Sequence, residues 1–462
     1  MKAETYRLLV LVGIAAALST SAAAQSNGSA GSSARGHIKS VTAITEVFGD
    51  GQKIVGAAVE FDALLDSARL LTSTFAVADR TITKVYANAS AARAARGVNG
   101  RYAIIELSTA DDAAAIIPAM GSRGGPGGPG GPGGPGGQSG ARAQGGQAQG
   151  PGGQRGGMGG PKRRPVKVSV TQSGELTTAA GTKYPAVAAA VESDNAINLI
   201  VDDFKPFVFK DAESGKTLMY NLFVPRNYDS KKSYPLVLFM HDASVVSSEP
   251  DRTLVQGLGA VIWASPEEQA KHPAFVLAPQ EDSQTGSDPT KTADLYARLV
   301  NSVVSQYSID KKRLYTTGQS AGCMRSIAID IKYPDLFAAS LLVAGQGDAQ
   351  EMLAMIHEKL WIIVSEGDFR AFPGMNASVE AWETAGAKIA KGRWSAREPQ
   401  EVQAANVARM IAERNTIMYT TYIKGTCLPP DLANSGGQEH MASWQFAYAI
   451  PAVRNWLFAQ SK

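Results

Sequence analysis

The stretch Thr317-Gly318-Gln319-Ser320-Ala321-Gly322 constrains the fold more than any other part of this chain. The β-prone residues Tyr315 to Thr317 precede it, and apolar residues continue after it at helical spacing. The pattern Gly-x-Ser-x-Gly between a strand and a helix is typical of a tight turn that lifts the serine hydroxyl out of a sheet. The pattern is weak by itself, because the chain holds 47 glycines. It predicts a nucleophilic serine only where a base and an orienting acid accompany it.

Two side chains further along the chain meet this requirement. In folds with this turn, the partners follow in the order serine, acid, histidine, on loops at the carboxyl ends of later strands. Asp368 comes just after the apolar run Leu360 to Ser365, where we expect a turn to expose it, and Glu366 is its nearest rival. Of the five histidines, only His440 follows this acid, in a segment predicted as a loop before the last helix. We therefore expect Ser320, Asp368 and His440 to form one catalytic site.

Two backbone N–H groups are also expected near the serine, because acyl transfer needs donors where the negative oxygen develops. One donor is predicted at Ala321, directly after the serine. The other is predicted in the loop after the strand-like run Leu236 to Met240, at Asp242 or Ala243. For His241 and Asp242 we expect a positional role rather than direct proton transfer.

The N-terminus and the overall charge restrict the class of protein. Residues 1–24 resemble a secretory signal peptide, with Lys2 and Arg7 before the apolar run Leu8 to Leu18 and alanines before Gln25. This run is too short to span a bilayer, so we expect a secreted or periplasmic protein without stable membrane insertion. The formal net charge of +3 is small for 462 residues, which argues against a nucleic-acid partner.

Composition divides the mature chain into two domains. After a small polar linker at 25–36, residues 37–204 read as an all-β sandwich of short strands, one of them Leu70 to Val77. A Gly/Pro-rich insert, 121–164, interrupts this domain, and we expect it to be disordered. From 205 to 462, strands alternate with helices, which predicts a mostly parallel sheet in an α/β domain. There, Ala260 to Trp263 is predicted as a strand and Trp444 to Phe458 as one closing helix.

The chain has only two cysteines, too few for a disulfide scaffold or a cysteine-rich metal site. Cys323 follows the serine turn, and Cys427 lies shortly before His440. In an oxidising compartment the two can pair and tie the helix after Ser320 to the histidine segment. The alternative is two buried thiols without a bond.

Further stretches carry a resemblance to a known family. Residues 205–462 resemble the α/β-hydrolase superfamily, and the whole mature chain resembles bacterial two-domain esterases with an immunoglobulin-like domain before the hydrolase domain. The stretches that carry the resemblance are Thr45 to Gln52, Arg80 to Tyr86, Leu238 to Ser244, Thr317 to Gly322, Ser365 to Asp368 and His440 to Trp444. Two features depart from the pattern. The Gly/Pro-rich insert is one, and the other is His241-Asp242, where the wider superfamily commonly has His-Gly.

The resemblance implies hydrolysis of small or medium carboxylic esters through Ser320, Asp368 and His440, without a metal or organic cofactor. A serine peptidase of the prolyl-oligopeptidase type and a polyester or feruloyl esterase are alternatives within the hydrolases. An adhesion or binding protein with a vestigial hydrolase domain is the alternative outside the enzymes. The expected partner is a small-molecule ester substrate, and assembly into a homo-oligomer stays open.

Overall fold

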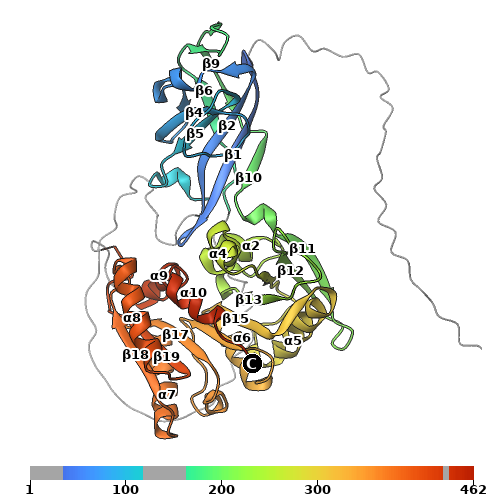
Figure 1. Ribbon diagram of the computed structural model, residues 1–462, viewed down its shortest axis with the longest axis vertical. Helices are drawn as coiled ribbons and strands as arrows, with labels where there is room; N and C mark the ends of the chain where they lie inside the picture. The colour runs from blue at the N-terminus through green and yellow to red at the C-terminus, as the bar shows by residue number, and fades with distance from the viewer. Residues whose placement is uncertain (1–34, 118–162, 430–435) are drawn as a thin grey trace, which may run out of the picture.

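The structure, a computed structural model, describes residues 35–117, 163–429 and 436–462 (Figure 1). The predicted signal peptide lies outside these residues, as do nearly all of the predicted linker and of the predicted disordered insert. Within the described residues, no helix is both long enough and apolar enough to cross a bilayer.

The N-terminal domain is built from β-sheets that share one core. Its larger sheet has the order β10-β1-β2-β5-β4, in which all neighbours are antiparallel except β1 and β10. The strands are β1 (Ile38–Phe48), β2 (Gly51–Leu65), β4 (Ile82–Asn88), β5 (Gly100–Leu107) and β10 (Asn195–Asn198). The smaller sheets consist of β3 (Ala76–Val77), β6 (Ser169–Gln172) and β9 (Val187–Glu192), and of β7 (Leu176–Thr177) and β8 (Lys183–Tyr184). Side chains such as Val59, Ile105 and Val170 meet between the sheets, so the expected all-β architecture is confirmed.

One predicted strand of this domain is wrong in most of its length. Only Ala76–Val77 pairs as a strand, while the residues before it form the 3-10 helices η1 (Ser67–Arg69) and η2 (Thr72–Thr74). The Thr74 hydroxyl accepts a hydrogen bond from the Leu71 N–H at 3.2 Å. Short polar side chains compete with sheet pairing in this way, which explains the turn.

The C-terminal domain contains a nine-stranded sheet in the order β11-β12-β14-β13-β15-β16-β17-β19-β18. From β14 to β18 all neighbouring strands are parallel, whereas β11 and β12 form an antiparallel edge. The strands are β11 (Lys205–Lys210), β12 (Thr217–Phe223), β13 (Tyr234–Met240), β14 (Phe275–Gln280), β15 (Ile309–Gln319), β16 (Ala339–Val343), β17 (Leu360–Ser365), β18 (Ile389–Trp394) and β19 (Ile417–Tyr422). The predicted α/β fold with a mostly parallel sheet is therefore confirmed.

Helices cover both faces of this sheet. On β17, Trp361 and Ile363 belong to one hydrophobic cluster, and Ile362 and Val364 belong to another. This alternation explains the continuous apolar run, because a strand buried on both faces has no polar side. One face is covered by α5 (Pro289–Gln306), α6 (Ala321–Lys332) and α7 (Ala371–Thr384). The other is covered by α2 (Arg252–Val255), α3 (Leu258–Val261), α8 (Gln400–Ala412), α9 (Gly436–Ala447) and α10 (Pro451–Phe458), with α4 (Pro266–Lys271) nearby.

Two further predictions for this domain are wrong. The run Ala260 to Trp263 is helical, divided between α3 and the 3-10 helix η6 (Ile262–Ala264), because a short buried apolar run has no period that separates strand from helix. The closing helix is two helices, interrupted before Pro451, whose ring removes a backbone donor and ends helical pairing. The first of these helices, α9, begins at Gly436, so His440 lies in its first half and not in the predicted loop.

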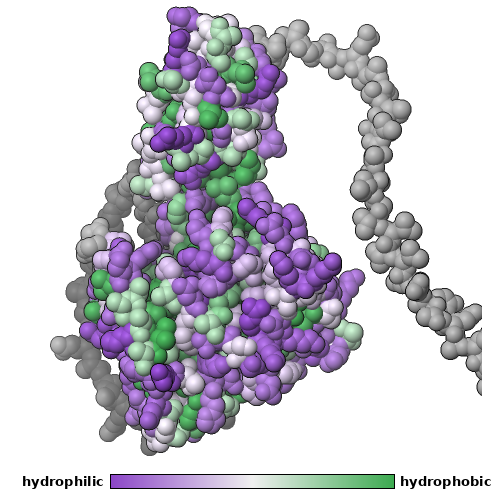
Figure 2. Space-filling model, in the orientation of Figure 1, coloured by the Kyte–Doolittle hydropathy of each residue, from purple (hydrophilic) through white to green (hydrophobic). Residues whose placement is uncertain are grey.

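The domains meet at the turn between β1 and β2, which points toward α2, α3 and α9 (Figure 1). A Cβ built on Gly49 would lie 2.3 Å from the Cβ of Gln445 in α9, so the turn packs closely on that helix. Arg163 adds an ion pair across the junction, 2.7 Å from Asp251. On the face drawn in Figure 2, hydrophilic residues predominate, and small hydrophobic patches lie among them.

Candidate active site

Ser320 occupies the sharp turn between β15 and α6. Its backbone has φ 53° and ψ −118°, a conformation that non-glycine residues rarely adopt. The turn is held from both sides, because the Ser320 N–H donates to the Val343 carbonyl and the Ser320 carbonyl accepts from the Met324 N–H, each at 3.0 Å. A strained residue persists where its surroundings hold it in this way.

The two glycines of the motif allow the backbone to pass this closely. A Cβ on Gly318 would lie 2.4 Å from the carbonyl carbon of Gly322. A Cβ on Gly322 would lie 2.0 Å from the carbonyl oxygen of Met240, at the end of β13. Both contacts are with backbone, so no side chain can move aside. The spacing of the motif therefore follows from a three-way crossing of β13, β15 and α6.

The structure brings the three predicted side chains together at the carboxyl edge of the sheet. The Nε2 atom of His440 lies 2.8 Å from the Ser320 hydroxyl oxygen. Its Nδ1 atom forms a short hydrogen bond with Oδ2 of Asp368. When Nδ1 donates its proton to the carboxylate, Nε2 is left as the acceptor for the serine hydroxyl. This tautomer can take a proton from Ser320.

Asp368 is held rigidly where β17 leads into α7. The expected exposure of this residue is wrong, because its side chain is only 1% exposed. Its Oδ1 accepts hydrogen bonds from the N–H groups of Arg370 and Ala371 at 2.9 and 3.0 Å. Burial raises the pKa of the Asp368 carboxyl, but the hydrogen bond and charge of His440 together with the two N–H groups outweigh it. The net result is a pKa below the ordinary value. The carboxylate thus stays ionised beside the imidazole at neutral pH.

The rival side chains are engaged elsewhere. Glu366 pairs with Arg393 at 2.6 Å. The hydrogen bond from Arg393 is the main reason that the pKa of the Glu366 carboxyl is lowered. In His241, Nδ1 donates to the Asp242 carbonyl at 2.7 Å and Nε2 accepts from the Glu281 N–H at 2.9 Å. Both ring nitrogens of His241 are thereby occupied, in keeping with a positional role.

The predicted oxyanion donors lie on two segments in close contact. Ala321 is the first residue of α6, and the first N–H groups of a helix have no partner within it. The close approach of Gly322 to Met240 sets this helix start against the loop that holds Asp242 and Ala243. The second donor, at Asp242 or Ala243, stays a prediction.

The aspartate that replaces the usual glycine turns its side chain inward. Oδ1 of Asp242 accepts from the Ser244 N–H at 2.8 Å, and Oδ2 accepts from Nε2 of Gln319 at 3.2 Å. Gln319 also donates to the side chain of Gln256 at 3.2 Å. The carboxylate therefore joins the loop after β13 to the residue before Ser320.

Of the two alternatives for the cysteines, the disulfide is not formed. Cys323 and Cys427 are both free and buried, and they belong to different hydrophobic clusters. Burial raises the pKa of both thiols, to about 12 for Cys427. The alternative of two inert buried thiols is what the structure contains.

The residues near the site that sequence reasoning missed are buried and polar. Gln319 is 2% exposed and Glu439 is 0% exposed, each next to a predicted site residue. A polar residue within an apolar or glycine-rich stretch, directly beside a candidate catalytic side chain, is the signal that would have found both.

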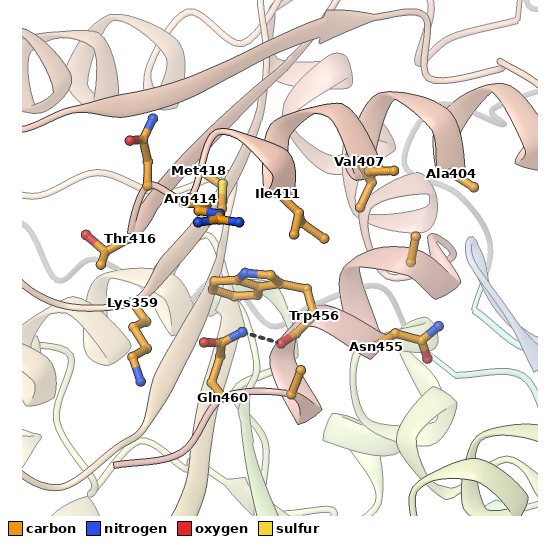
Figure 3. Close-up of a pocket in the computed structure, with 14 residues that line it drawn as sticks. Lys359, Ala404, Val407, Ile411, Arg414, Thr416, Met418, Asn455, Trp456 and Gln460 are labelled. Carbon is orange, nitrogen blue, oxygen red and sulfur yellow. Dashed lines mark hydrogen bonds between the residues drawn. The ribbon is translucent and has the colours of Figure 1, made fainter.

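A cavity of about 580 Å³ lies at the opposite edge of the sheet. It is lined by Lys359 and Thr416, which directly precede β17 and β19, and by Ile411 and Trp456 from α8 and α10 (Figure 3). The candidate site is at the carboxyl ends of the same parallel strands, so this cavity is separate from it. Within the described residues, no group of three or more His, Cys, Asp or Glu side chains is arranged to hold a metal ion.

The strand–serine–helix turn at the carboxyl edge of a mostly parallel, doubly covered sheet defines an α/β-hydrolase. Comparisons with known proteins specify the class further. Residues 40–185 match the model for the esterase Ig-like N-terminal domain, and residues 218–390 match the model for the PHB depolymerase esterase. The crystal structure of a thermostable esterase is similar over 92% of this chain and 100% of that chain, with a TM-score of 0.72 and 26% identity. The chain thus combines an α/β-hydrolase domain that matches an esterase family model with a domain that matches the immunoglobulin-like N-terminal domain of esterases.

Shorter matches connect the chain with curated relatives. Acetylxylan esterase A of Emericella nidulans is 41% identical over 49 residues, and that of Aspergillus ficuum is 39% identical over 49 residues. Each match covers 11% of this chain and only 16% of the relative's length.

Proposed function

We propose that this protein is an exported serine carboxylesterase that hydrolyses small to medium carboxylic esters. The observation that carries the proposal is the continuous hydrogen-bonded chain from Asp368 through His440 to Ser320. The esterase matches over both domains support the same reaction class.

The reaction proceeds in two acyl-transfer steps. The Ser320 oxygen attacks the ester carbonyl carbon while Nε2 of His440 takes the hydroxyl proton. Asp368 stabilises the imidazolium that forms. The N–H of Ala321 and that of Asp242 or Ala243 stabilise the negative oxygen of the tetrahedral intermediate.

Collapse of this intermediate breaks the bond to the alcohol oxygen, and His440 returns its proton to the departing alcohol. Water then attacks the acyl-enzyme carbonyl with His440 again acting as base. The carboxylic acid leaves, and the Ser320 hydroxyl is restored. No step uses a group from outside the chain apart from substrate and water.

The acyl and alcohol preferences are part of the proposal. The curated relatives are named acetylxylan esterases, and the matching domain model is named for PHB depolymerase. Short acyl groups are accordingly the first substrates to test, with a polyester as the second.

A p-nitrophenyl ester series of increasing acyl length, run on the wild type and on Ser320→Ala, tests the proposal. We expect hydrolysis of short esters and a loss of about 10⁴-fold or more in kcat in the variant, because the three side chains act as a unit. Near-normal activity in Ser320→Ala would falsify the assignment. Cleavage of matched amides but not of esters would point instead to the peptidase alternative.

Export rests on residues 1–24 and has its own test. Expression of the full chain in a bacterial host with a Sec pathway, followed by N-terminal sequencing of the exported protein, should give Gln25 as the first residue. Retention of Met1 on all of the protein would contradict cleavage.

A further inference from the structure

A buried glutamate beside the histidine connects the segments that carry the proposed acid and base. The Glu439 side chain is 0% exposed. Its carboxylate accepts a short hydrogen bond from the Ser365 hydroxyl and a second one from the Gly425 N–H at 2.8 Å. Ser365 is the last residue of β17, and Gly425 follows β19. The carboxylate therefore joins α9 to the carboxyl ends of two strands.

A glycine next to the proposed acid makes room for this carboxylate. A Cβ built on Gly367 would lie 2.1 Å from Cδ of Glu439 and equally close to one of its oxygens. The backbone just before Asp368 consequently packs directly on the side chain just before His440. With the carboxylate in place, no larger residue fits at position 367.

We propose that Glu439 is a positioning residue of the esterase site. It fixes α9 against β17 and β19, so that the imidazole of His440 stays between Asp368 and Ser320. This inference rests on the proposed function. The hydrogen bond from His440 to Asp368 fixes the imidazole at one point of the loop after β17. The attachment one residue away, from Glu439 to Ser365 and Gly425, fixes the backbone of α9 next to His440 against both strand ends.

A carboxylate suits the position because both of its neighbours are donors. Two acceptor oxygens satisfy the Ser365 hydroxyl and the Gly425 N–H at once. Glutamine keeps one acceptor oxygen, which can serve the Gly425 N–H, and replaces the other oxygen with an NH₂ group. The Ser365 hydroxyl can rotate and accept a hydrogen bond from this NH₂ group, whereas a backbone N–H could not. Alanine leaves the buried Ser365 hydroxyl and the half-buried Gly425 N–H without their acceptor and opens a cavity. The effects of glutamine and alanine should therefore be graded.

The test measures kcat and KM for p-nitrophenyl acetate in Glu439→Ala, Glu439→Gln and Ser320→Ala. We expect Glu439→Ala to lower kcat about 100-fold while KM stays within about threefold, because a displacement near 1 Å of a catalytic group has that effect. Glu439→Gln should lie between alanine and wild type. The low-field proton resonance of the bond between His440 and Asp368 should be sharp in the wild type and broadened or lost in Glu439→Ala.

Glu268→Gln is the matched control for losing a buried carboxylate. Glu268 is 2% exposed and accepts from Nε of Arg454 at 2.6 Å, away from the candidate site. Its replacement should lower Tm and leave kcat unchanged. If Glu439→Ala does not fold, Gly367→Ala replaces it, because the added methyl group displaces the carboxylate without changing any charge.

Several outcomes would overturn the positioning role. One is a kcat within about threefold of wild type in both Glu439→Ala and Gly367→Ala. Another is a loss of kcat in Glu268→Gln as large as that in Glu439→Gln, when the two variants have the same Tm. If Ser320→Ala is inactive while the Glu439 variants are active, only the positioning role fails. If Ser320→Ala hydrolyses the ester normally, the proposed function itself fails.

Discussion

Gly322→Ala tests whether the crossing of three backbones behind Ser320 sets the catalytic geometry. The new Cβ would lie 2.0 Å from the Met240 carbonyl oxygen and 2.8 Å from the His241 carbonyl oxygen. Both atoms belong to backbone, and real Cβ contacts below 3.0 Å are essentially never seen, so α6 and the loop after β13 must separate by about 1 Å. This movement carries Ala321 away from Asp242 and Ala243, and so widens the proposed oxyanion site.

Two effects of this substitution oppose each other. Alanine in place of glycine favours a helix by roughly 0.5–1 kcal/mol. A 1 Å displacement at the site costs about 10²-fold in rate, which corresponds to about 2.7 kcal/mol of transition-state stabilisation. The displacement is the larger effect for catalysis, so we expect kcat/KM to fall about 100-fold even if the helix itself is not weakened.

The assay is p-nitrophenyl acetate hydrolysis, with Tm followed by circular dichroism and Gly386→Ala as the control. Gly386 has φ +96° and nothing within 4 Å of a built Cβ, so alanine there costs stability through the backbone alone. The control should lose Tm and keep its activity. A Gly322→Ala enzyme with kcat/KM within about threefold of wild type would refute the reasoning.

Three further outcomes are expected. Asp368→Asn should lower kcat by about 10⁴-fold, because the amide holds His440 in the wrong tautomer. Its Tm should fall as well, because the lowered pKa of Asp368 means that the ionised carboxylate stabilises the fold, and kinetics with melting curves check both. Burial raises the pKa of Asp330 to about 8, so the folded state holds this proton more tightly than the unfolded state, and stability falls as pH rises from about 4 to 8. Asp330→Asn should flatten that fall, and Tm values at pH 5 and pH 8.5 that decline equally in both proteins would contradict it. Cys323 and Cys427 should both react with a thiol reagent in denaturant, equally with and without prior reduction.

The sequence was a good guide where chemistry is local. The turn at Ser320 needs small residues two positions away on both sides, and this requirement is visible as Gly318 and Gly322. Long apolar runs such as β17 marked strands buried on both faces. Asp368 and His440 followed from their order in the chain, because that order reflects which strand ends lie at one edge of a parallel sheet.

The sequence was a poor guide where a segment's state depends on its neighbours. Ala260 to Trp263 was wrongly predicted as a strand, because a short buried apolar run has no period that separates strand from helix. Its packing in the folded domain determines that it is helical. The two cysteines, each near a predicted site residue along the chain, lie in separate hydrophobic clusters. Distance along the chain carries no information about such pairings.

Local patterns and chain order were therefore enough to single out Ser320, Asp368 and His440 as candidates, and the structure places their side chains within hydrogen-bonding distance of one another. The surroundings of that site were decided only by folding. Glu439 contacts Ser365 across 74 positions, and Gln319 contacts Asp242 across 77. Hydrogen bonds of this kind depend on how whole strands and helices pack, and no short stretch of sequence records that packing.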